Sequence, residues 1–121
     1  ADNKISGSEI LRSPGLWKKH YSPKAKLVIL SWKNEWELSA QLSTFNFEPS
    51  EIYVIAHTQI PWRHELGRIS VIPHDAEAFA RALYAELHRC DEAGAKLIVV
   101  EALPETEEWR AIVDRLNRAA T

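Results

Sequence analysis

Short apolar runs alternate with helical stretches along most of this chain, and no other feature constrains its fold as strongly. The apolar runs begin at Leu27, Ile52, Ile69 and Leu97. Continuous runs of this length are typical of strands that are buried on both faces of a sheet. Helical stretches separate most of them, so the order predicts a mostly parallel sheet of about four to five strands in a layered α/β domain.

The first and second helical stretches carry the residues that start or stop a helix. Asn34 offers a cap for the first helix, with Glu37 three residues further on. Asp75 offers a cap for the second helix, and Gly94 stands where a left-handed terminator is needed. The apolar faces that these two helices should bury are Leu38, Leu42 and Phe45 in the first, and Ala76, Phe79, Ala80, Leu83, Leu87 and Cys90 in the second.

A third helix is expected near the end of the chain. Thr106 is its expected cap, and two glutamates follow in the first turn. Its inner face should consist of Trp109, Ile112, Val113 and Leu116.

The motifs that hold phosphates or metals are missing from the sequence. None of the four glycines belongs to a GxGxxG or GxxxxGK[ST] loop, so a dinucleotide site is not expected. No HExxH pattern or close His/Cys cluster exists, so no metal site is predicted. The histidines at 57, 64, 74 and 88 are interpreted as loop or surface residues and Cys90 as a buried small hydrophobe, so no catalytic residue is assigned.

The chain holds five tryptophans, at positions 17, 32, 36, 62 and 109. Trp109 is expected in the core. Trp32, Trp36 and Trp62 are expected to be partly exposed, as amphipathic aromatic residues are where one domain docks on another. Ordinary core and rim packing explains the same residues equally well.

Charge and hydropathy limit the partners of the chain. Its 15 basic and 17 acidic side chains give a net charge of −2, which argues against a uniformly basic nucleic-acid clamp. The apolar runs are too short to span a membrane, and no secretory signal is expected from the first residues. A single cysteine rules out an internal disulfide framework, so the cytoplasm is the expected compartment.

Residues 1–26 differ from the rest and are expected to form an extended, locally basic linker arm ahead of an α/β domain at 27–121. Within the arm, Pro14-Gly15 predicts a turn and Pro23 holds the preceding residue extended. Between them lie Lys18, Lys19, His20 and Tyr21, a compact set of groups for binding phosphate or carboxylate. A solvated linker is the equal alternative on physical grounds.

The stretch from Ser13 to Pro23 resembles the SPGMKYRHYAP-type linker of two-domain threonylcarbamoyl-AMP synthases. Trp17, Lys18 and Lys19 depart from that pattern, and Lys19 lacks the fork of the family's arginine. The residues that match outright are Ser13, Pro14, Gly15, His20, Tyr21 and Pro23. Later segments also resemble the family, namely Leu83 to Leu87, Cys90-Asp91, Ala111-Ile112, Arg115-Leu116 and Arg118-Ala119-Ala120.

The resemblance implies a three-layer Rossmann-like accessory domain, called the Sua-five domain, behind a linker. In that family an N-terminal YrdC-like domain converts L-threonine, bicarbonate and ATP into threonylcarbamoyl-AMP and pyrophosphate, for the threonylcarbamoyladenosine modification of tRNA. ATP and Mg²⁺ would serve that domain, tRNA would be an indirect partner, and this chain alone would have no activity. The linker would gate the active site through the substrate-contacting residues Ser13, Pro14, Gly15, Lys18, Lys19, His20, Tyr21 and Pro23.

Two other functions remain open from the residues themselves. The α/β domain could be a non-catalytic nucleotide-, RNA- or protein-binding module that uses the carboxyl ends of its strands, around Ser31, His57 and Glu101. A small enzyme built on the loop 57–67 is the third hypothesis, but no nucleophile–base pair can be named for it.

Overall fold

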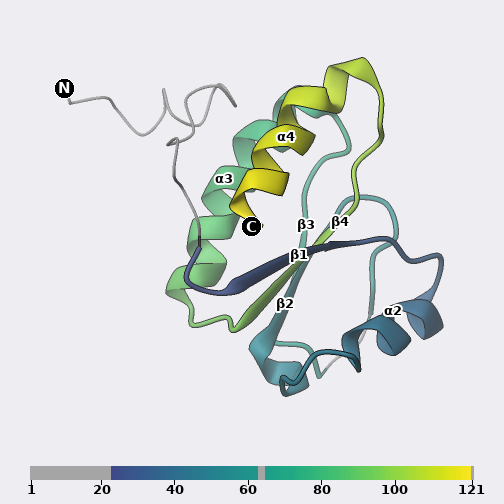
Figure 1. The fold of residues 1–121 in the computed structure, drawn as a ribbon, viewed down its shortest axis with the longest axis vertical. Coiled ribbons are helices and arrows are strands. Elements are labelled where there is room, and N and C mark those ends of the chain that lie inside the picture. The colour runs from purple at the N-terminus through teal and green to yellow at the C-terminus, as the bar shows by residue number, and fades with distance from the viewer. Residues whose placement is uncertain (1–22, 63–64, 121) are drawn as a thin grey trace.

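The computed structural model describes residues 23–62 and 65–120, and four parallel strands form its sheet. The spatial order of the strands is β1-β4-β2-β3, and every neighbouring pair runs parallel (Figure 1). Their bounds are β1 (Lys26–Leu30), β2 (Ile52–Ala56), β3 (Arg68–Val71) and β4 (Leu97–Glu101). This confirms the expected α/β class, and the sheet is entirely parallel over the described residues.

Helices cover both faces of the sheet and make the domain three layers thick. Helix α2 (Glu35–Leu42) lies on one face, whereas α3 (Ala76–Glu92) and α4 (Arg110–Ala119) lie on the other (Figure 1). Short 3₁₀ turns at Pro49–Glu51 and Glu107–Trp109 precede β2 and α4. Alternate residues of each strand face the two layers, so the described core divides into two clusters across the sheet.

The connections between strands run in opposite directions on the two faces. The chain passes from β1 over α2 to β2, and later returns from β3 over α3 to β4, which lies between β1 and β2. If both crossovers have the same hand, connections on opposite faces of the sheet must run in opposite directions. The neighbouring strands β1 and β4 therefore lead to helices on different faces, and this makes their carboxyl ends a topological switch point.

The predicted caps of the first two helices, α2 and α3, are confirmed. Oδ1 of Asn34 accepts the N–H of Glu37 at 2.9 Å, and Oδ2 of Asp75 accepts the N–H of Ala78 at 3.0 Å. Gly94 has a φ of 93°, in the left-handed region that glycine adopts without strain.

Two helix expectations need correction. Helix α2 ends at Leu42 rather than running on to Phe45, because the hydroxyls of Ser43 and Thr44 donate to carbonyls of the last turn, at 2.8 and 2.7 Å. Thr106 makes no side-chain cap, and a 3₁₀ turn stands between it and α4.

Strand β1 is less buried than its apolar sequence suggests. It was expected to be covered on both faces, but its last three residues are only half-buried. The reason is its position at the edge of the sheet, whereas all five residues of the central strand β4 are buried. Strand β3, the other edge, begins at Arg68 and ends at Val71, one residue earlier than expected.

Two glycines offer a direct test of this packing. A Cβ on Gly67 would collide with the carbonyl oxygen of Ser50 and the ring of Tyr53, whereas a Cβ on Gly94 would meet nothing within 4 Å. We expect Gly67→Ala to cost about 2 kcal/mol through overpacking. Gly94→Ala should cost about 1 kcal/mol through its backbone conformation alone. Urea unfolding measures both free energies, and a Gly67→Ala cost no larger than that of Gly94→Ala would contradict this packing.

Candidate functional site

The arm joins the domain at a carboxylate on the last turn of α3. The N–H groups of Lys24 and Ala25 donate to Oδ2 and Oδ1 of Asp91, at 3.0 and 2.9 Å. Pro23 and Ala25 are buried on either side of the exposed Lys24. We call this contact the arm anchor. It fixes the chain at the amino end of β1, before the first strand residue.

The position of Asp91 indicates what stabilises the anchor. A carboxylate in the last turn of a helix faces the negative end of the helix dipole, which disfavours it. Two hydrogen bonds from backbone N–H groups to a charged acceptor offset that cost. Gly94 then ends the helix, and the chain turns back to start β4 beside β1.

Of the arm residues expected to contact substrate, only Pro23 is described. It is buried beside the arm anchor. The other expected contact residues lie outside the described part of the chain: Ser13, Pro14, Gly15, Lys18, Lys19, His20 and Tyr21.

The carboxyl edge of the sheet is built around another carboxylate, and this one is buried. Glu101, at the end of β4, is 6% exposed. Its Oε1 accepts the N–H groups of His57 and Thr58, both at 2.9 Å, and its Oε2 accepts that of Gln59 at 3.0 Å. Three consecutive N–H groups that converge in this way form a nest for an anion. A nucleotide phosphate could use this nest only by displacing the carboxylate.

His57 completes the network, and it lies in the loop after β2, as expected, but not at the surface. Its side chain is 4% exposed. Its Nε2 lies 3.0 Å from the carbonyl oxygen of Ala102, which can only accept, so this nitrogen carries the hydrogen. Its Nδ1 lies 2.8 Å from the Thr58 hydroxyl and 2.9 Å from Nδ1 of His74. The ring also meets Phe79 edge-on, with centroids 5.6 Å apart, and lies 6.4 Å from Trp109.

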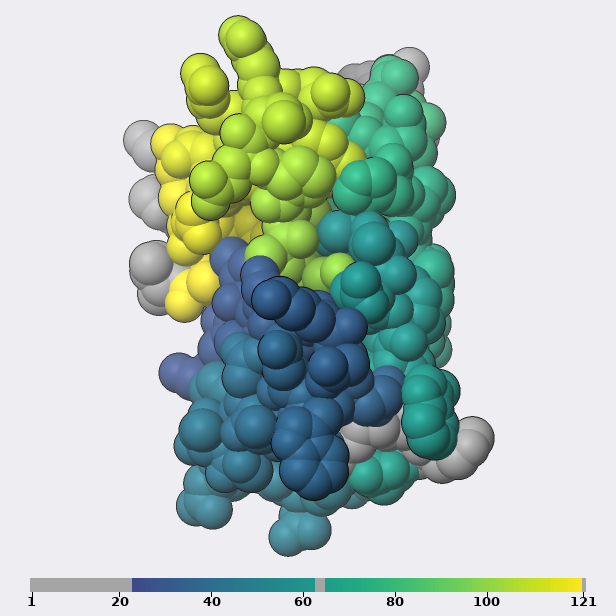
Figure 2. Space-filling view, turned by 90° about the vertical axis from the view of Figure 1, so that its right-hand side faces the viewer, coloured from purple at the N-terminus to yellow at the C-terminus, as the bar shows by residue number. Residues whose placement is uncertain are grey.

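These contacts suit the carboxyl edge for holding segments together rather than for proton transfer. Glu101 accepts from backbone amides, and both ring nitrogens of His57 already have partners. Of the three residues named from sequence, the structure brings His57 and Glu101 together, whereas the carbonyl of Ser31 accepts the side-chain amide of Gln41 at 2.7 Å. Figure 2 faces this edge, where the segments after β1 (blue), β2 (teal) and β4 (light green) meet.

A second buried carboxylate, Glu86 on α3, connects that helix to the edge strand β3. It accepts a hydrogen bond from the Ser70 hydroxyl and others from Arg68 and Arg89, both at 2.9 Å. Burial alone would raise the pKa of Glu86, but the hydrogen bonds from Ser70 and Arg68, with the charges of Arg68 and Arg89, outweigh it and lower the pKa.

The single cysteine lies beside this network and is chemically inert. Burial, reinforced by the negative charge of Glu86, raises the pKa of Cys90 to about 12. The thiol therefore stays protonated and does not serve as a nucleophile. This confirms its interpretation as a buried small hydrophobe.

Residues 23–62 and 65–120 hold no group of three or more His, Cys, Asp and Glu side chains that could bind a metal ion. No helix in the same ranges is long and apolar enough to cross a membrane.

The tryptophans divide into two buried and two exposed in the described ranges. Trp109 is in the core, as expected. Trp32 was expected to be partly exposed, but it is buried and its indole N–H donates to the carbonyl of Gln59 at 2.9 Å. Trp36 and Trp62 are 84% and 73% exposed.

Comparison with known proteins places this architecture. The family model for the C-terminal domain of threonylcarbamoyl-AMP synthase matches residues 2–121. A threonylcarbamoyl-AMP synthase from Pyrococcus abyssi is 22% identical over 112 residues, which cover 90% of this chain and 32% of that protein. The chain thus spans about a third of the length of its curated relative.

A solved structure shows the same fold. The crystal structure of P. abyssi Sua5 complexed with L-threonine matches with a TM-score of 0.63 and 21% identity, over 88% of this chain and 31% of that chain. The likeness confirms the three-layer, Rossmann-like architecture.

The nest at the carboxyl edge predicts that neutralising Glu101 lowers the free energy of unfolding. Glu101→Gln replaces one accepting oxygen with an amide nitrogen that faces N–H donors, so we expect a cost of about 2 kcal/mol in the free energy of unfolding. Glu105→Gln makes the same chemical change at an exposed position and should cost almost nothing. Urea unfolding compares the two, and equal costs would rule out the role assigned to the nest.

The lowered pKa of Glu86 predicts how stability depends on pH. Its folded pKa lies below the ordinary value of 4.5, so its contribution to stability is complete above that value and is lost as pH falls through the folded pKa. We expect Glu86→Gln to cost about 1 to 2 kcal/mol at neutral pH, and less in acid. Glu77→Gln, on the same helix but with a 78% exposed carboxylate, is the control. A Glu86→Gln cost that does not shrink in acid would contradict the prediction.

Proposed function

Because the chain belongs to the family of C-terminal domains of threonylcarbamoyl-AMP synthase, we propose that residues 1–26 are the linker arm and residues 27–121 the accessory domain of an L-threonylcarbamoyladenylate synthase. A YrdC-like domain in the same protein would join L-threonine, bicarbonate and ATP and release pyrophosphate. The length of the curated relative, of which this chain spans 32%, leaves room for such a domain. The product would serve tRNA modification in the cytoplasm, and tRNA would meet the catalytic domain rather than this one.

The arm would act as a gate over the catalytic cleft. Closure excludes water, and water would destroy a reactive carbamate intermediate. Lys18 and Lys19 would meet the phosphates of ATP or the threonine carboxylate, and His20 and Tyr21 would add hydrogen bonds. Ser13, Pro14, Gly15 and Pro23 would shape the arm around them.

The arm anchor is the observation that carries this proposal. A gate positions its contacts only if one of its ends is held at a fixed point, since small displacements of catalytic contacts cost much of the rate. Asp91 supplies such a point, because it holds the backbone of two consecutive residues directly after the arm motif. The accessory domain would then set where the arm starts and how far it reaches.

The chemistry of the described residues supports a non-catalytic role for the domain itself. Glu101 and His57 are engaged with backbone groups and with His74, and Cys90 is a protonated thiol. We therefore expect no turnover by this chain alone, and the reaction would take place in the catalytic domain.

The experiment changes the anchor in the complete synthase. Asp91→Ala removes two hydrogen bonds to a charged acceptor, so we expect amide exchange at Lys24 and Ala25 to accelerate and kcat/KM for pyrophosphate release to fall on the order of tenfold. Glu92→Ala, the neighbouring exposed position, is the matched control and should change neither quantity.

Two results would count against the gate. Faster exchange at Lys24 and Ala25 with unchanged kinetics would show that the anchor holds the arm but that the arm does not limit the reaction. Normal kinetics in a variant carrying alanine at Lys19, His20 and Tyr21 together would also show that the arm does not limit the reaction, and this variant leaves the domain unchanged.

A further inference from the structure

The two exposed tryptophans flank a groove that the proposed function does not use. The groove has a volume of about 470 Å³ and lies between the start of α2 and the loop after β2. Its walls are Trp32, Trp36 and Trp62, together with Asn34, Glu35 and residues 59–60. We call it the Trp groove. Large apolar side chains gathered on one face mark a place where something binds.

Glu35 gives the Trp groove its chemical character. Its Oε2 accepts the N–H of Trp62 at 2.8 Å, which fixes the carboxylate between α2 and the loop. Its Oε1 is buried and has no hydrogen-bond partner among the described residues. A carboxylate held in this way gives the wall of the groove a negative charge at a fixed place.

We propose that the Trp groove binds the guanidinium group of an arginine presented by a partner protein. A guanidinium pairs with a carboxylate and stacks on indole rings through its flat face, so one group suits both the charge of Glu35 and the aromatic walls. An anion would be repelled by Glu35, and an apolar side chain would leave its charge without a counterpart. Charge complementarity and the exposed indoles therefore select the same occupant.

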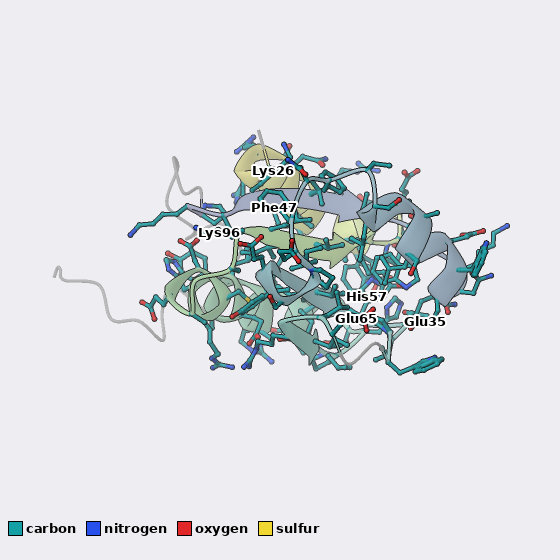
Figure 3. The ribbon with its side chains drawn as sticks, turned by 90° about the horizontal axis from the view of Figure 1, so that it is seen from below. Lys26, Glu35, Phe47, His57, Glu65 and Lys96 are labelled. Atoms are coloured by element: carbon teal, nitrogen blue, oxygen red, sulfur yellow. The ribbon has the colours of Figure 1, made fainter. Side chains whose placement is uncertain are left out.

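The site is independent of the arm anchor and of the proposed gating. Glu35 lies with His57 toward one end of the molecule, whereas Lys96, which precedes β4, lies toward the other, where the anchor is (Figure 3). A partner in the Trp groove would leave the contact between Asp91 and the arm untouched. The inference stands whether or not this chain gates a synthase.

The test uses the whole ¹⁵N-labelled chain and two short peptides. One presents a single arginine, and the other presents citrulline, which has the same shape without the charge. We expect the indole N–H signals of Trp36 and Trp62 to shift with the arginine peptide, with a dissociation constant on the order of 10 mM for an isolated side chain. The citrulline peptide should shift them far less.

Three variants locate the binding. Glu35→Gln keeps an oxygen for the Trp62 N–H but loses the charge, and should weaken binding about fivefold or more. Trp36→Ala removes a wall that is 84% exposed, so it should weaken binding without unfolding the domain. Glu105→Gln, an exposed glutamate that does not line the groove, should bind like the parent chain.

Each contrary outcome has a clear meaning. Equal shifts with both peptides would overturn cation recognition, and so would an unchanged affinity in Glu35→Gln. An arginine response confined to signals away from Trp36 and Trp62 would overturn the location. Self-association of the chain that Trp36→Ala abolishes would show that the groove receives a second copy instead.

Discussion

Parallel pairing of β4 with both β1 and β2 is the constraint on which the rest of this domain depends. It makes β4 the buried centre of the sheet. Because all pairs are parallel, the amino ends of the strands lie at one end of the sheet and their carboxyl ends at the other. The arm anchor lies at the end with the amino ends, where Asp91 accepts hydrogen bonds from Lys24 and Ala25. The nest around Glu101 and the Trp groove lie at the end with the carboxyl ends. One sheet thereby separates a point that fixes the arm from a face that is open to a partner.

Three hydrogen-bonded carboxylates fix the course of segments in this domain, two of them buried (Glu86 and Glu101) and one half-buried (Asp91). Asp91 and Glu101 each accept consecutive backbone N–H groups, and Glu86 accepts from side chains of β3 and α3. A carboxylate that accepts hydrogen bonds from consecutive backbone groups fixes the course of that segment. These contacts are the structural basis of the positioning role proposed for the domain.

Signals between neighbouring residues in the sequence predicted local structure well. They did not predict contacts between residues that lie far apart in the chain. The caps at Asn34 and Asp75 and the terminator at Gly94 depend on neighbouring residues, and the structure confirms all three. The burial of His57 and Trp32 depends on partners far along the chain. The ring of His57 packs near Phe79 and Trp109. The indole of Trp32 donates to the carbonyl of Gln59. Strand order decided those contacts, and apolar runs alone do not reveal which strand lies at an edge.

The central claim is that this chain positions an arm for a reaction that another domain performs. Threonine- and bicarbonate-dependent release of pyrophosphate from ATP tests it most directly, measured for the chain alone, for the catalytic domain alone and for the two joined in their natural order. The account predicts no release by the chain alone, little by the catalytic domain and full release by the joined protein. Full release by the catalytic domain without this chain would contradict it.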